Sequence, residues 1–146
     1  MQELKFVERI LGIDYGDSRT GIAVSDLMGW TAQGVETITY KGDYKLLLKR
    51  IEELIKEYDI KKILIGYPRN LNGTVGPRAT KTEEFIKILI DKFNLPVIKW
   101  DEWLSTVSAH RDMNEMGVKN RKKKGLVDTI AAVHILQNYL DSLAMK

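Results

Sequence analysis

Apolar and polar positions alternate through the first forty residues in the manner of β-strands. Apolar-rich runs at 9–14 and 18–26 are joined by Tyr15-Gly16-Asp17, and residues 34–40 alternate like a third, half-exposed strand. The glycines at positions 12, 16 and 21 indicate tight turns or close approaches of the backbone. This part of the chain therefore predicts three strands, with the first two forming a hairpin.

The spacing of apolar residues changes after residue 43. An apolar stripe with helical spacing follows Asp43, which can cap the helix; its members are Tyr44, Leu47, Leu48, Ile51, Leu54, Ile55 and Tyr58. Residues 62–66 then form a short continuous apolar run, which is typical of a strand buried on both faces of a sheet. A long loop from Tyr67 to Ala79 separates this strand from a second helix, for which Thr80 and Glu83 form a capping box.

The last third of the sequence predicts one strand and two helices. Residues 96–102 return as a strand, and Ser105 caps a helix that runs to about Met116. After a basic segment, a final helix is expected from Leu126 to Leu143. Hairpin strands followed by right-handed crossovers give a mixed α/β fold, a sheet flanked by helices.

Length and composition favour a soluble globular protein with one domain over 1–146. The chain has 146 residues, 44% hydrophobic and 29% charged, which is enough to bury a substantial core. It has no cysteine, so disulfides are excluded and thiolate metal sites are disfavoured. No signal peptide and no membrane-spanning run is visible in the sequence. We therefore expect a cytoplasmic protein with no membrane association.

Positive charge is concentrated in one segment of the chain. The net charge is +3 and the isoelectric point is near 9.0. Between His110 and Gly125 there are six basic residues against two acidic ones, a surplus of four. Such a basic segment is often a solvated loop, but it also suits contact with a phosphate backbone, which gives affinity that falls with salt.

Three acidic residues lie at the ends of apolar elements. Asp14 and Glu102 each close an apolar strand, and Asp128 opens an apolar helix. Carboxylates set against apolar structure are costly unless a cation or hydrogen bonds compensate them, and three that converge would repel one another. A divalent metal site is the interpretation we favour. Alternation in a strand sends Asp101 and Glu102 to opposite faces, so we expect one of them at the site. We favour Glu102, whose longer side chain suits a bridging ligand, with Asp101 as the alternative.

Each of these signals has a structural alternative. A turn aspartate can bond to nearby backbone N–H groups, and an acidic strand end can simply be solvated. Asp128 would also gain about 0.3–1 kcal/mol from the helix dipole. However, it shares a helix face with Ala131, Ala132 and Ile135, which would place it against the sheet.

Four blocks of sequence, in order, resemble the YqgF (RuvX) family, described as Holliday junction resolvase-like nucleases. They are Ile-Leu-Gly-Ile-Asp-Tyr-Gly at 10–16 with Arg-Thr-Gly-Ile-Ala-Val-Ser-Asp at 19–26; Gly-Tyr-Pro at 66–68 with Asn-Gly-Thr at 72–74 and Gly-Pro-Arg at 76–78; Trp-Asp-Glu at 100–102 with Leu-Ser-Thr at 104–106; and Val127-Asp128 with Ala131-Ala132. The resemblance covers nearly the whole chain. One departure is visible, because Trp103 stands where the family usually has an arginine after the acidic pair.

The resemblance implies an RNase H-like fold, with three antiparallel strands followed by parallel ones. It also implies that Asp14, Glu102 and Asp128 are catalytic and hold Mg²⁺, with Mn²⁺ as a substitute. The implied activity is a nuclease that processes the 5′ end of pre-16S ribosomal RNA during ribosome biogenesis, or that resolves branched DNA. The residues expected to contact nucleic acid are Arg19, Arg69, Asn72, Arg78, Lys119, Arg121, Lys122, Lys123 and Lys124.

Other functions compatible with the sequence are of different classes. An actin-like ATPase or sugar kinase also begins with an Asp-x-Gly hairpin, but such proteins clamp the nucleotide between two domains. A nucleic-acid-binding module without catalysis could use the same basic surface. The sequence does not distinguish RNA from DNA, because backbone contacts dominate in both cases. It is compatible with a monomer or a homodimer.

Overall fold

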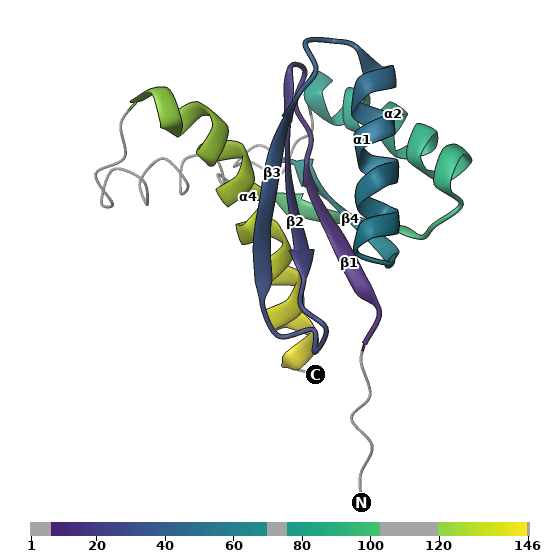
Figure 1. Cartoon of the computed structure of the whole chain (residues 1–146), viewed down its shortest axis with the longest axis vertical. Coiled ribbons are helices and arrows are strands. Elements are labelled where there is room, and N and C mark those ends of the chain that lie inside the picture. The colour runs from purple at the N-terminus through teal and green to yellow at the C-terminus, as the bar shows by residue number, and fades with distance from the viewer. Residues whose placement is uncertain (1–6, 70–75, 103–119, 146) are drawn as a thin grey trace, which may run out of the picture.

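The computed structural model describes residues 7–69, 76–102 and 120–145. Within these ranges the chain forms one mixed sheet with helices on both faces (Figure 1). The elements in chain order are β1 (Arg9–Asp14), β2 (Arg19–Ser25), β3 (Ala32–Thr39), α1 (Tyr44–Glu57), β4 (Ile60–Pro68), α2 (Pro77–Phe93), β5 (Val97–Glu102) and α4 (Asn120–Ala144).

The sheet has the strand order β3-β2-β1-β4-β5. Strand β1 pairs antiparallel with β2, and β2 pairs antiparallel with β3. The other pairs, β1 with β4 and β4 with β5, are parallel. This confirms the predicted order of three antiparallel strands followed by parallel ones. Because β1, β4 and β5 run parallel, their C-terminal ends lie at the same edge of the sheet.

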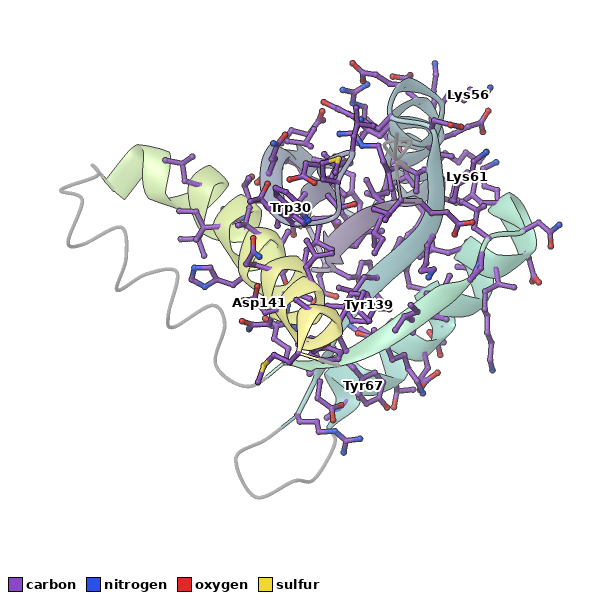
Figure 2. The ribbon with its side chains drawn as sticks, turned by 90° about the horizontal axis from the view of Figure 1, so that it is seen from below. Trp30, Lys56, Lys61, Tyr67, Tyr139 and Asp141 are labelled. Atoms are coloured by element: carbon purple, nitrogen blue, oxygen red, sulfur yellow. The ribbon has the colours of Figure 1, made fainter. Side chains whose placement is uncertain are left out.

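Helices α1 and α2 cover one face of the sheet, and α4 covers the other (Figure 1). Figure 2 shows the same arrangement from below, with Tyr139 of α4 close to the sheet, where its ring meets Trp100 edge-on at 5.3 Å. The core under α1 and α2 is the larger, and its wholly buried members include Leu47, Ile51, Leu54, Phe85 and Leu89. The core under α4 mixes large side chains such as Leu64, Ile135 and Leu136 with Ala23 and Ala132.

The first predicted helix is confirmed. Helix α1 begins at Tyr44, and the carboxylate of Asp43 accepts a hydrogen bond from the Lys45 backbone N–H at 3.2 Å. Its apolar face lies on the sheet through Leu47, Ile51 and Leu54, as the spacing predicted.

Two helix starts were predicted wrongly. Helix α2 begins at Pro77 after Gly76, not at the expected Thr80–Glu83 capping box. Proline at the first helical position is itself a start signal, because its missing N–H would have no partner there. Helix α4 begins at Asn120 rather than Leu126, so the run 121–124 lies in its first turns. The helix propensity of arginine and lysine outweighs their unfavourable interaction with the helix dipole.

The helix expected at 105–116 lies outside the described residues. Among the helices in the described ranges, none combines the length and the apolarity that crossing a bilayer requires.

Candidate active site

Asp14 and Glu102 lie on the face of the sheet that α4 covers. In β1, Leu11 and Ile13 point into the core under α1 and α2, so the alternate residue Asp14 points to the other face. In β5, Ile98 and Trp100 pack under α4, and Glu102 continues that alternation. Both strands end at these carboxylates, so the two side chains occupy one edge and one face of the sheet.

Asp101 belongs to the opposite face. Its Oδ1 lies 2.6 Å from Nε of Arg69, and this ion pair is substantially exposed. The dipeptide thus divides as alternation predicted, with only Glu102 turned toward Asp14.

Helix α4 brings Asp128 to the same place through a close approach to β2. Asp14 pairs with Gly21 across the β1–β2 ladder. A Cβ on Gly21 would stand 1.8 Å from the backbone carbonyl oxygen of Asp128, so only glycine allows the helix to lie at this distance. Ala131 and Ala132 on the same helix are fully buried. Small residues on both elements therefore fix the position of Asp128 over the start of β2.

Gly66 of β4 makes room for the Glu102 side chain. A Cβ on Gly66 would lie 2.5 Å from Oε2 of Glu102 and 2.7 Å from Cδ1 of Ile135. The Glu102 carboxylate consequently lies over the backbone of β4, which is the neighbour of β1 in the sheet. Close backbone approaches were predicted at Gly12 and Gly21 but not at Gly66. A glycine that ends a buried apolar strand also indicates a close approach, so Gly66 could have been predicted.

Burial raises the pKa values of two of the carboxyl groups, and repulsion by neighbouring carboxylates adds to the shift of Asp14. Asp14 is 9% exposed, and its pKa lies well above the usual range, first because of burial and then because of the negative charges of Glu102 and Asp128. Burial raises the pKa of Glu102 to about 7. The positive charge of Arg78 opposes both shifts. The three carboxylates thus form an electrostatically strained cluster that favours a cation.

Three of the arginines assigned to nucleic acid from the sequence, Arg19, Arg69 and Arg78, have partners within the protein. Nε of Arg19 lies 3.2 Å from Oδ2 of Asp128. Nη2 of Arg78, in the first turn of α2, donates to the Tyr15 carbonyl oxygen at 3.4 Å, and its charge acts on Asp14 and Glu102. Arg69 pairs with Asp101. Sequence reasoning missed these internal roles because each joins elements that are distant in the chain.

The remaining predicted nucleic-acid residues are placed only in part. Residues 121–124 belong to α4, whose start projects beyond the sheet (Figure 1). Asn72, Lys119 and Trp103 lie outside the described residues.

The cluster is looser than a finished metal site. In the ranges that the structure describes, no three His, Cys, Asp or Glu side chains are gathered tightly enough to hold one ion as they stand. The donor set nevertheless matches a hard divalent cation, because all three side chains supply carboxylate oxygens. A cation would relieve the repulsion that raises the pKa of Asp14.

Comparison with known proteins agrees with this geometry. The family model described as RuvX, Holliday junction resolvase, matches residues 8–142. The chain belongs to the RuvX family. A relative from Ruminiclostridium cellulolyticum is 61% identical over 136 residues, spanning 93% of this chain and 96% of its own length. A relative from Bacillus subtilis is 51% identical, spanning 92% of this chain and 99% of its own length. Both carry the name "Putative pre-16S rRNA nuclease".

Solved structures confirm the fold of this RuvX family member. RuvC of Thermus thermophilus, in complex with a Holliday junction substrate, superimposes with a TM-score of 0.57 at 12% identity, covering 96% of this chain and 98% of that one. At this identity the likeness establishes the architecture alone. Together with the mixed five-stranded sheet, it confirms the RNase H-like fold expected from the sequence.

Proposed function

We propose that this RuvX family member is a metal-dependent nuclease that hydrolyses phosphodiester bonds in precursor 16S ribosomal RNA, cutting internally near the 5′ end of the mature sequence. The names of the relatives support the substrate. The observation that carries the chemistry is the cluster of Asp14, Glu102 and Asp128 at one edge and one face of the sheet. In an open α/β sheet, the carboxyl ends of the strands are the usual place for a ligand.

Asp14, Glu102 and Asp128 would hold Mg²⁺, or Mn²⁺ in its place. Carboxylate oxygens are the ligands that these hard cations prefer. When bound, the metal polarises a phosphoryl oxygen and lowers the pKa of a bound water. The protein's part is to keep the three carboxylates on one face and to limit water around Asp14, which is 9% exposed.

The basic residues would position the substrate beside the carboxylates. Arg78 is close enough for its charge to act on Asp14 and Glu102, so a phosphate that reaches them also meets this guanidinium. The run 121–124 lies on the same helix as Asp128, a few residues before it. Contacts of this kind hold the backbone without reading sequence, and they predict cleavage that weakens as salt rises.

Asp14→Asn tests the proposal. It keeps the shape of the side chain and removes the charge, so Mg²⁺-dependent cleavage of a precursor 16S transcript should fall to background while the protein stays folded. Asp17→Asn is the matched control, because Asp17 lies in the same hairpin, is exposed, and pairs with Lys81 at 3.3 Å. Undiminished cleavage by Asp14→Asn would refute the assignment of Asp14.

Resolution of branched DNA is the second candidate, favoured by the family's description. The two are separated by offering a precursor 16S transcript and a four-way DNA junction side by side, with and without Mg²⁺. Junction resolution needs two active sites, so it also predicts a homodimer on the DNA. Tight binding of either substrate without any cleavage would instead indicate a binding module.

A further inference from the structure

Arg19 and Asp128 form an ion pair that the fold builds at the proposed metal site. Arg19 is the first residue of β2, two positions before Gly21, so both project on the face that α4 covers. Gly21 allows the backbone of Asp128 to rest on this strand, and the carboxylate then meets the guanidinium at 3.2 Å. The contact between α4 and β2 therefore brings Arg19 and Asp128 together.

This ion pair places a cation of the protein itself on a carboxylate proposed to bind metal. The side chain of Asp128 is 17% exposed and that of Arg19 is 37% exposed. A carboxylate oxygen that faces a guanidinium at this distance is less available to a divalent ion, because the two cations repel each other. The described carboxylates also do not yet form a closed set of metal ligands.

We propose that Arg19 is a positioning residue that occupies the metal's place on Asp128 until the metal binds, and that is then released toward the substrate phosphate. This rests on the proposed function, because it takes Asp128 as a metal ligand. The exchange gives Asp128 a cationic partner in both states. In the metal-free state Arg19 compensates Asp128, and in the loaded state the freed guanidinium lies beside the position of the phosphodiester.

The proposal predicts opposite effects of one substitution on metal and on substrate. In Arg19→Gln the competing cation is gone, so Mn²⁺ should bind about two- to fivefold more tightly, the range expected for a partly exposed ion pair. The KM for nucleic acid should rise, because a phosphate contact is lost. A purely structural role of Arg19 would instead weaken metal binding, because Asp128 would lose its support.

Titration calorimetry with MnCl₂ on the metal-free full-length protein, without nucleic acid, measures the first effect. Arg19→Lys keeps the charge and should restore Mn²⁺ affinity to near the wild-type value. Arg50→Gln is the matched control. Arg50 of α1 pairs with Glu36 of β3 at 2.6 Å, the pair is exposed to a similar degree as Arg19 and Asp128, and no metal ligand is proposed there. It should leave Mn²⁺ affinity unchanged. Circular dichroism spectra and melting temperatures verify that each variant is folded.

The outcomes separate this inference from the proposed function. Wild-type binding of Mn²⁺ with equal or weaker binding by Arg19→Gln overturns the exchange and leaves the metal-dependent nuclease intact. A wild-type protein that binds no Mn²⁺ at millimolar concentration overturns both. Tighter binding by Arg19→Gln, reversed in Arg19→Lys and absent in Arg50→Gln, supports the exchange.

Discussion

The face of the sheet under α1 and α2 is filled by large aliphatic and aromatic side chains, whereas the face under α4 combines aliphatic and aromatic side chains with glycine, alanine and the three carboxylates. On the first face, Leu47, Ile51 and Leu54 are fully buried. On the second, Gly21 and Gly66 let the backbone of α4 and the Glu102 side chain approach where a methyl group would not fit. The first face therefore supplies stability, and the second gives up burial to bring charged groups together.

This division predicts that the two faces respond differently to substitution. Changes under α1 and α2 should reduce the free energy of unfolding and leave the chemistry alone. Changes under α4 should affect catalysis more than stability, and some should even stabilise the protein.

Leu54→Ala should be the most destabilising of these changes. Leu54 is fully buried between α1 and the sheet, and removing its side chain leaves a cavity, which costs about 2–5 kcal/mol. Urea unfolding measures this loss. Because α1 lies on the face opposite the carboxylates, kcat/KM measured well below the melting temperature should stay within about twofold of wild type. A large fall in kcat with the fold intact would show that the two faces are coupled.

Glu102→Gln should stabilise the metal-free protein at alkaline pH. Glu102 has a pKa of about 7 when folded, against a usual value of 4.5. The folded state therefore holds this proton more tightly, and its contribution to stability is lost as pH rises from about 4.5 to about 7. The shift of the Glu102 pKa from 4.5 to about 7 corresponds to about 3 kcal/mol in the free energy of unfolding. Glutamine carries no such charge, so the variant should exceed wild type at pH 8 and match it near pH 4.

Urea unfolding across pH in the presence of a chelator checks this expectation. Glu83→Gln provides a control of opposite sign, because Lys99 holds the pKa of Glu83 below its usual value through a contact of 2.7 Å. Glu83 contributes stability above its unfolded pKa, and acid removes it. If the free energy of unfolding of the wild type does not fall relative to that of Glu102→Gln between pH 5 and pH 7, then the pKa of Glu102 is not raised in the folded state.

Gly21→Ala should affect both stability and catalysis. The added methyl group would meet the Asp128 carbonyl, which is rigid backbone, so α4 must shift away from β2 at a cost of about 1–3 kcal/mol. Asp128 would move with it, and cleavage should be lost even where the protein is folded. Gly34→Ala is the comparison, because its methyl group would meet side chains rather than backbone, Cγ2 of Thr129 at 2.8 Å and Cγ2 of Val133 at 3.4 Å. Equal activity of the two variants would show that the position of Asp128 is not critical.

The sequence predicted the fold well because the strands and α1 follow local periodicity. It also placed Asp14 and Glu102 at strand ends, and alternation separated Asp101 from Glu102, but the face that Glu102 shares with Asp14 comes from the pairing of the strands. It failed where partners come from distant segments. Glu83 was taken for a capping residue, yet it pairs with Lys99 of β5. Arg19 was assigned to substrate, yet it meets Asp128 more than a hundred positions later, which no local pattern reveals.

The smallest expected change in stability, paired with a large change in activity, comes from Gly66→Ala. The new methyl group would lie 2.5 Å from Oε2 of Glu102 and 2.7 Å from Cδ1 of Ile135, both of which are ends of side chains that can rotate away. The cost in stability should therefore stay near or below about 1 kcal/mol. The Glu102 carboxylate would be displaced from the cluster, so metal-dependent cleavage should fall at least about tenfold.

Gly76→Ala is the matched control for that change. Gly76 caps α2 with an extended backbone, and a Cβ there meets nothing within 4 Å. The substitution should cost about 0.5–1 kcal/mol, because alanine is a poorer N-cap than glycine, and it should leave cleavage unchanged. If Gly66→Ala and Gly76→Ala cleave equally well, then the space over β4 does not set the position of Glu102. The α4 face would then be built for packing, like the opposite one.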